Sequence, residues 1–441
     1  MKEEERAKRE GEERQAESAR RWATRFDVIG DPRVRAAVED YYGEFYDPEK
    51  IIRWWAGLFD PELGAFYYAN SARDNEGFLP DMESTYQIAQ RLRLFDQNED
   101  LARYLGPGIT AKMIEFYRSK QDPEDGYFYH PQWTKEESRK KVMRYTRDQD
   151  WTIRMLKWLH SSPLYPTAID RAVSGGSAST AWEPNAASVA AYVNDLLATR
   201  SCESWSNALQ TEATLFRAAG MLDTVLDILD ARINPEYGLW VTGYDEASDR
   251  YYNLKSTPEE ETPYGLYTCT YKLTIMYNLG GRLVPYAAKM VENGIKAVLS
   301  EDPGVRVTYL FNPWATFGTV RTNLKNHGTP AMLAEYDALI SENVLAMLAA
   351  VKKTLGCYRC DDGSYGFLQS GSSPTIYGTP VSLGVKEGDV NANNLVISFS
   401  QHICNTIGLS DFIPVFNEKH AALMKDLLEN APRIQKRGTR A

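Results

Sequence analysis

One short turn motif recurs along this chain and limits what it can fold into. In its full form an Asp or Asn is followed by Pro-Glu, then by one variable residue, a Gly and aromatic residues. The copies occupy 60–67, 122–129, 234–240 and, in a shortened version, 361–367. Asp and Pro favour a tight turn, Gly supplies a positive φ angle, and the aromatic side chain closes the edge of a core. The copies are spaced by roughly 60 residues or twice that, which is typical of stacked helical hairpins.

The segments between the turns carry apolar residues at helical spacing. Residues 47–58 are an example, with a polar Asp-Pro-Glu start followed by apolar residues on one face. No stretch shows the sustained alternation of a β-strand. We therefore predict an all-α fold, a single-domain (α/α)6–7 toroid in which hairpins close into two concentric rings. The predicted organisation is a charged arm at 1–30, the toroid at 31–430 and a basic tail at 431–441.

Composition excludes several classes of protein. The net charge of −10 argues against nucleic acid as a partner, and no apolar run is long enough to span a membrane. Residues 1–26 alternate Lys and Arg with Glu and lack the apolar core of a signal peptide, so a cytoplasmic protein is expected. Cys357 and Cys360 form a single C-x-x-C without the second pair that structural zinc needs. We predict no metal and no cofactor; the oligomeric state stays open.

The aromatic content points to carbohydrate. The chain has 27 Tyr and 10 Trp, and aromatic faces pack against the apolar faces of sugar rings. A large core also needs aromatic residues, so this favours a sugar ligand without proving one. Since the chain is acidic overall, an anionic oligo- or polysaccharide would require a local basic pocket. No P-loop, G-x-S-x-G elbow or H-E-x-x-H zinc motif is present.

The segment Asn326-His327-Gly328-Thr329 carries a resemblance to a known family. It is similar to the Asn-Asn-His-Gly segment of helical-toroid polysaccharide lyases of the alginate-lyase and heparinase type, with Lys325 in place of the first Asn. The resemblance implies that Asn326 and His327 neutralise the carboxylate of a uronic acid during β-elimination. It also implies that Tyr377, some 50 residues later, acts as base and acid. The family has an arginine shortly before this tyrosine, whereas the nearest one here is Arg359. The structural alternative is that His327 caps or packs a helix start.

Other polar residues near the turns are candidates for substrate contact. Arg144 and Arg147 would clamp a carboxylate, or would pair with Asp148 and Asp150 in a structural network. The remaining candidates are aromatic or imidazole side chains next to a turn or a helix start: Tyr129, His130, Trp133, Tyr264 and Tyr267. The last two tyrosines are rivals of Tyr377 for the role of base and acid.

Three other functions stay open beside the lyase. A glycoside hydrolase would use a pair of carboxylates, and five acidic residues could provide it: Asp81, Glu83, Asp148, Asp150 and Asp389. Sugar epimerases use similar toroids. A non-catalytic helical-repeat binding protein would share the helical hairpins but would need no reactive side chains.

Overall fold

The computed structural model describes residues 12–13, 16–96, 98–173, 181–248, 250–253, 255–409 and 414–436 of the chain. Within these residues the protein is mostly helical, and the prediction of an all-α fold is confirmed. The described strands form three short antiparallel pairs: β1 (Phe59–Asp60) with β2 (Ala65–Phe66), β3 (Gly243–Asp245) with β4 (Arg250–Tyr252), and β5 (Thr375–Ile376) with β6 (Thr379–Pro380).

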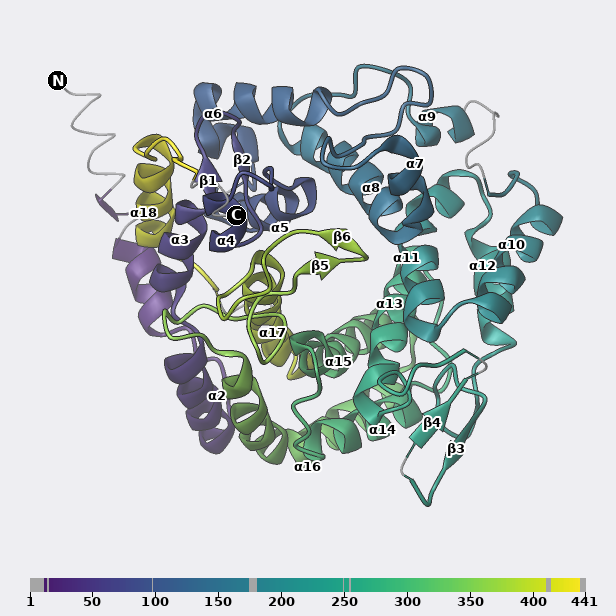
Figure 1. Cartoon of the computed structure of the whole chain (residues 1–441). Helices are drawn as coiled ribbons and strands as arrows, with labels where there is room; N and C mark the ends of the chain where they lie inside the picture. The colour runs from purple at the N-terminus through teal and green to yellow at the C-terminus, as the bar shows by residue number, and fades with distance from the viewer. Residues whose placement is uncertain are drawn as a thin grey trace.

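An inner layer of helices surrounds the centre of the molecule (Figure 1). Its members in the described chain are α5 (Met82–Leu92), α8 (Val142–Trp158), α11 (Cys202–Ala218), α13 (Pro263–Gly280), α15 (Val307–His327) and α17 (Val390–Thr406). Each of these helices packs on the next one in chain order, and α17 packs back on α5, so the series of contacts closes on itself.

An outer layer covers this inner one (Figure 1). Its longer helices are α2 (Pro32–Phe45), α3 (Pro48–Gly57), α6 (Leu101–Arg118), α10 (Ala186–Thr199), α12 (Leu222–Asp230), α14 (Ala287–Leu299), α16 (Pro330–Leu355) and α18 (Glu418–Glu429). The shorter helical segments are α4 (Asn70–Asp74), η1 (Arg93–Phe95), α7 (Lys135–Lys140), α9 (Ala168–Val173) and η2 (Gly356–Tyr358). The C-terminal α18 packs on the N-terminal α3 and so joins the two ends of the chain.

The recurring turns adopt the geometry predicted for them. Asp60 Oδ1 accepts hydrogen bonds from two following backbone N–H groups at 2.9 and 3.1 Å, and Asp122 Oδ1 does the same at 2.9 and 3.2 Å. Gly64 and Gly126 have φ angles of +65° and +74°. A Cβ atom on Gly126 would lie 2.1 Å from the carbonyl oxygen of Pro166, so no other residue fits there. The predicted mechanism of the turn is confirmed.

These turns also set the direction of the inner helices. The turns at 60–67, 122–129, 234–240 and 361–367 come between an outer helix and the inner helices α5, α8, α13 and α17, respectively. Side chains that accept a hydrogen bond from the first helical turn then start several inner helices: Asp81 for α5, Ser201 for α11, Thr262 for α13 and Asp389 for α17.

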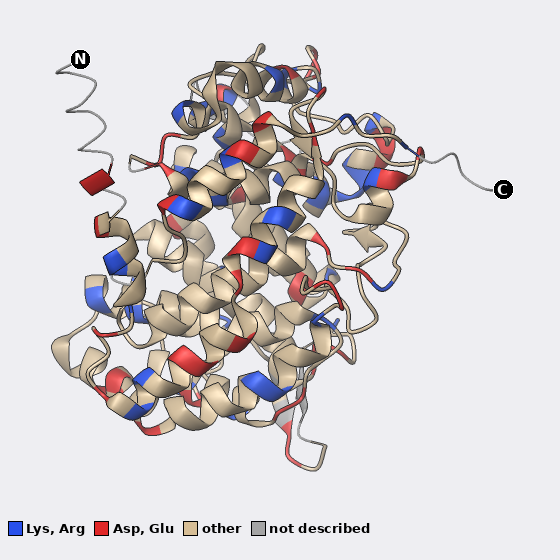
Figure 2. Cartoon of the chain, turned by 90° about the vertical axis from the view of Figure 1, so that its left-hand side faces the viewer, with Lys and Arg blue, Asp and Glu red and all other residues tan. Residues whose placement is uncertain are grey.

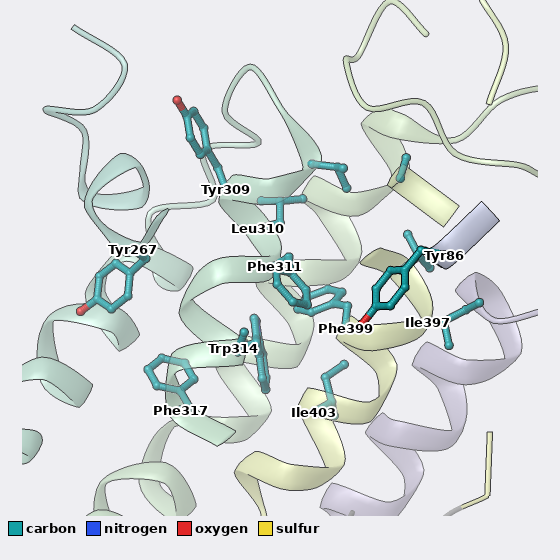
Figure 3. Packing of buried hydrophobic residues seen from close by; sticks show 14 of the residues in the cluster. Tyr86, Tyr267, Tyr309, Leu310, Phe311, Trp314, Phe317, Ile397, Phe399 and Ile403 are labelled. Atoms are coloured by element: carbon teal, nitrogen blue, oxygen red, sulfur yellow. The ribbon is translucent and has the colours of Figure 1, made fainter. Parts of the chain in front are cut away.

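The core between the inner helices is aromatic. The Trp314 ring of α15 lies edge-on to Phe317 at 6.0 Å and to Phe399 of α17 at 5.8 Å, and all three side chains are almost fully buried. Figure 3 shows Trp314 and Phe399 between α15 and α17, with Phe317 on the other side of α15. Edge-to-face pairs of this kind stabilise a core beyond the area that they bury.

The ends of the chain are partly docked on the helical layers. Phe26 and Ile29 are buried, and Trp22 packs edge-on against His420 of α18 at 5.0 Å. The core thus extends into the segment predicted to be a solvated arm. At the other end, Arg433 pairs with Glu62 at 2.6 Å. The rest of the predicted arm, 1–11 and 14–15, and the last residues of the predicted tail, 437–441, lie outside the described residues.

The outer surface carries both signs of charge. On the face shown in Figure 2, acidic and basic residues alternate along the outer helices, and no broad basic face is visible. Within the described ranges, no helix has both the length and the apolar character needed to cross a membrane.

Candidate functional site

Two neighbouring cavities lie among the inner helices. The first, which we name the rim cavity, has a volume of about 530 Å³ and is lined by five inner helices, four through their N-terminal parts and α13 through its middle. One representative from each is Arg147 of α8, Glu203 of α11, Lys272 of α13, Thr308 of α15 and Asn391 of α17. Helix N-termini carry partial positive charge, so their convergence favours an anionic group in this cavity.

The second cavity, named the central cavity, has a volume of about 550 Å³. It is lined by polar side chains of α5 and α17 together with aromatic residues of α8, α13 and α15. Five residues line both cavities: Arg147, Tyr271, Phe311, Asn391 and Leu395. The two cavities are therefore adjacent, and together they form one hollow among the inner helices.

The β5–β6 hairpin brings Tyr377 to the rim cavity. The hairpin projects across the centre of the ring (Figure 1), and its two-residue tip is Tyr377-Gly378. Both residues have positive φ angles, +49° and +77°, as a type I′ turn requires. A non-glycine residue in this region is strained, and such strain is concentrated at functional sites. The Tyr377 ring lies under the guanidinium of Arg147, with 4.6 Å between Cζ and the ring centroid.

Three cations and one carboxylate line the rim cavity within the described residues: Arg147, Lys272, Arg306 and Glu203. Arg306 pairs with both Glu203 and Glu259 at 3.0 Å, and Arg147 pairs with Glu83 at 2.8 Å. Lys272 Nζ donates to the carbonyl of Thr268 at 2.9 Å. The lining itself thus carries more cations than carboxylates, although both arginines are paired with acids and the whole chain carries a net charge of −10.

Burial changes the acid–base properties of two of these side chains. Burial raises the pKa of Tyr377 to about 12, although Arg147 opposes the rise. Burial lowers the pKa of Lys272 to about 8, although the charge of Glu203 opposes the fall. Near neutral pH the tyrosine holds its proton, while about one tenth of the lysine is neutral. The cavity therefore contains a proton donor and a proton acceptor.

The two arginines predicted to clamp a carboxylate have different surroundings. Arg144 is 1 % exposed and lies in a buried network, where Nε donates to both Asp148 oxygens at 3.0 Å and the guanidinium also pairs with Asp81. Arg147 pairs with Glu83 at 2.8 Å but also lines both cavities. Arg144 therefore belongs to a buried structural network, as the alternative interpretation held, whereas Arg147 faces the hollow.

The carboxylates considered for a hydrolytic pair do not line either cavity. Asp81 and Asp148 are tied to Arg144, and Asp150 pairs with Arg154 at 3.1 Å. Asp389 is fully buried and accepts backbone hydrogen bonds from Phe367 at 2.7 Å and Ala392 at 2.8 Å. Glu83 is buried with the two arginines. These acids position helices and cations rather than facing a substrate.

The predicted sugar platform around the second turn lies away from the cavities. His130 is 1 % exposed, its Nε2 is 2.9 Å from the carbonyl oxygen of Pro80, and its ring packs on Trp133 at 4.5 Å. Tyr129 donates its hydroxyl to Asp125 at 2.7 Å. The structure brings none of the three to the hollow, and His130 is a packed loop residue, as the alternative interpretation held.

The rival tyrosines are core residues. Tyr264 donates to the carbonyl of Val298 at 3.3 Å and Tyr267 to the carbonyl of Met290 at 2.6 Å, and both side chains are at most 2 % exposed. Their hydroxyls are hydrogen-bonded to backbone groups of α14. This corrects the expectation that either could replace Tyr377 in chemistry.

Asn326 and His327 are also not brought to Tyr377. Both are exposed and lie in the last turn of α15, the helix whose start carries Arg306. The 21 residues of α15 place its two ends about 30 Å apart. His327 lines a different surface cavity, beside Asp223 and Gly281. This corrects the predicted grouping of Asn326, His327 and Tyr377, because an inner helix separates the imidazole from the hairpin.

Three charged residues of the rim cavity were missed by the analysis of the sequence. Glu203 and Arg306 lie at the starts of inner helices, where polar residues were sought, but they belong to segments without the turn motif. Lys272 is the only charged residue in α13, a helix of otherwise apolar and neutral polar residues. An isolated lysine in such a helix is a signal that could have been used.

The donor set offers little to a metal ion. Among the described residues no three His, Cys, Asp or Glu side chains gather into a ligand group.

Comparisons of the chain with protein-family models, curated proteins and solved structures find no match.

Proposed function

We propose that the two helical layers form an (α/α)6 toroid. The supporting observation is the closed order of packing among α5, α8, α11, α13, α15 and α17. Each of these inner helices follows an outer one in the chain, which corresponds to six hairpins rather than seven. In such a ring the inner helices run the same way, and the loops before them gather at one end. The rim cavity lies at that end.

We propose further that the rim cavity is the active site of a carbohydrate-active enzyme that cleaves a uronic-acid-containing glycan by β-elimination. One observation carries this proposal: a protonated tyrosine, a lysine with a lowered pKa and two arginines face the same cavity. Elimination requires a site for the carboxylate, a base for the proton at C5 and an acid for the leaving oxygen.

Arg147 and Arg306 would hold the carboxylate of the uronate. Arg147 uses one Nη on Glu83 and has further N–H groups for a substrate, whereas Arg306 binds Glu203, Glu259 and the Tyr309 hydroxyl and has only a second Nη1 hydrogen to offer. Hydrogen bonds to the carboxylate become stronger as negative charge develops on it in the transition state. The Glu partners hold the two guanidinium groups in place before substrate binds.

Lys272 and Tyr377 would move the protons. Neutral Lys272 takes the C5 proton, the electrons of the C5–H bond form the C4=C5 double bond, and the C4–O bond breaks. The phenol of Tyr377 gives its proton to the departing oxygen. Proton exchange with water then restores the neutral lysine and the phenol. The tyrosine is therefore the acid here, since a pKa of about 12 makes it a poor base near neutral pH.

Hydrolysis has weaker support. Inverting and retaining hydrolases use two carboxyl groups, separated by about 6.5–9.5 Å or about 5 Å. In the described part of the chain, Glu203 is the only carboxylate that lines either cavity, and it is paired with Arg306. An epimerase would share the removal of the C5 proton but would release no leaving group.

The test is to incubate the protein with glucuronan, alginate and heparin-like chains and to follow the ultraviolet absorbance of the unsaturated uronate. The proposal predicts a rise in absorbance with at least one of these chains and none with Tyr377→Phe. New reducing ends without absorbance would establish hydrolysis instead. Binding without any change in the glycan would point to a binding protein.

A further inference from the structure

The central cavity has a polar lining that the proposed chemistry does not use. Along α17, the residues Asn391, Asn394, Ser398, Gln401 and Asn405 recur every three or four positions, so they share one face of the helix. All five line the central cavity, and Asn391 also lines the rim cavity. From the first to the last of them α17 rises by about 21 Å. This polar stripe is therefore longer than one monosaccharide.

The neighbouring helix α5 faces the stripe with more uncharged donors and acceptors. Gln87 and Gln90 line the same cavity, as does Arg91. The Arg91 guanidinium donates to Asn394 at 2.6 Å, to Gln401 at 2.7 Å and to Ser398. It is thus occupied by neutral side chains and fixes their orientation. No carboxylate of the described chain lines this cavity.

Several polar atoms of the central cavity have no hydrogen-bond partner. Gln87 Oε1, His402 Nδ1 and Asn405 Oδ1 are each buried and unpaired, and the Gln87 side chain is only 4 % exposed. Burial lowers the pKa of His402 to about 3, so its imidazole is neutral and one ring nitrogen can accept. These three atoms are closed off from the cavity by their neighbours, so the groups that a ligand can contact are the partly exposed side chains of the stripe, Asn391, Asn394, Ser398, Gln401 and Asn405.

The apolar part of the lining complements these groups. Trp151, Tyr271 and Phe311 also line the central cavity. Carboxamides that offer both donors and acceptors, set beside aromatic rings and without opposing charge, suit a ligand with many hydroxyl groups and apolar ring faces. A second uronate would find no cation of its own here, because Arg91 is engaged by neutral side chains and Arg147, paired with Glu83, is assigned to the uronate of the rim cavity.

We propose that the central cavity is a binding subsite for a neutral sugar residue next to the uronate held in the rim cavity. The inference rests on the proposed function in that it assigns the rim cavity to the uronate. It narrows the substrate to a mixed glycan in which a uronic acid is linked to a neutral sugar. A glycan made of uronate alone would fill the rim cavity but would set a second carboxylate against the uncharged amide and hydroxyl groups of the central cavity.

The test is calorimetric titration with three probes: D-glucuronic acid, a disaccharide of glucuronic acid linked to glucose, and a disaccharide of two glucuronic acids. We expect the mixed disaccharide to bind at least about tenfold more tightly than either of the others. Gln90→Ala and Asn405→Ala should each weaken its binding by about three- to tenfold and should leave glucuronic acid unaffected. Asn194→Ala, which removes an exposed carboxamide on α10, is the matched control.

Two results would overturn the subsite. One is a mixed disaccharide that binds no more tightly than glucuronic acid, or not at all. The other is an equal loss of affinity for both ligands in the variants, with thermal unfolding showing that they are folded. These titrations measure binding and not turnover, so they test the subsite independently of the proposed function. A protein that shows the predicted binding pattern but no elimination activity would support the subsite and would contradict the lyase proposal.

Discussion

Replacing Lys272 by methionine should abolish turnover and at the same time stabilise the fold at neutral pH. The displacement of the Lys272 pKa from 10.5 to about 8 corresponds to roughly 3 kcal/mol at about 1.36 kcal/mol per pKa unit. Between the folded-state pKa of about 8 and the unfolded-state pKa of 10.5, the folded state binds fewer protons than the unfolded state. The free energy of unfolding therefore includes this roughly 3 kcal/mol only above the higher pKa. This contribution is lost as the pH falls through the lower one. Methionine keeps the apolar stem and removes the cost of the buried charge.

The same pKa fixes the pH dependence of the reaction. Neutral Lys272 is about one tenth of the total at pH 7, half at about pH 8 and nine tenths at about pH 9. The value of kcat/KM should therefore rise about tenfold between pH 7 and pH 9 and then level off. Initial rates on a cleaved polyuronate across this range give the profile, and thermal unfolding at neutral and alkaline pH gives the stability.

Lys296→Met, at an exposed position of α14, is the control for loss of a lysine and should change neither quantity. Retention of turnover by Lys272→Met would remove this residue from the mechanism. An inactive variant that is less stable than the wild type at neutral pH would show that Lys272 has a structural role, and would refute the reasoning from burial.

Three further changes test other parts of the account. Tyr377→Phe should lower kcat by about 10²–10⁴-fold with little change in KM, and a kcat within twofold of wild type by steady-state kinetics would exclude it as the acid. Glu212→Gln should leave the melting temperature unchanged near pH 4 and raise it near pH 8. Burial raises the pKa of Glu212 to about 7, so the wild type loses stability as the pH rises from the pKa of the unfolded state through that of the folded state. Melting temperatures of wild type and variant that change in parallel with pH would contradict this. Arg144→Met leaves buried acids unpaired and should cost roughly 3–5 kcal/mol in urea unfolding; a loss below about 1 kcal/mol would mean that the network is not held by its charge.

The local structure could be predicted from the sequence to a large extent. The Asp-Pro-Glu-x-Gly turns have fixed chemistry, so Gly64 and Gly126 could be assigned positive φ angles, and the intervening segments could be assigned to helices. The start of the core could not be placed, because Phe26 and Ile29 follow a run of charged residues and gain their burial only from contacts with distant parts of the chain.

The site was predictable in part. Tyr377 and Arg147 were identified, and the structure brings them into contact. His327 was grouped with Tyr377 because of the resemblance to the lyase segment, but a short sequence motif does not show at which end of a helix layer its residues lie. Residues 309–318 of α15 are buried on every side, as expected of an inner helix, so the residues at its C-terminus lie at the opposite end from Arg306. Lys272 and Arg306 are brought together by packing between helices, which no local pattern encodes.

The central claim is that the rim cavity breaks a glycosidic bond without adding water. The most direct measurement is mass spectrometry of the products formed in water enriched in heavy oxygen. Elimination predicts that the fragment with the new non-reducing end carries an unsaturated uronate. This fragment should be lighter by one water than the fragment formed by hydrolysis, and its unsaturated end should contain no heavy oxygen. Fragments that carry one heavy oxygen at the cleaved bond, with no unsaturated uronate, would contradict the account.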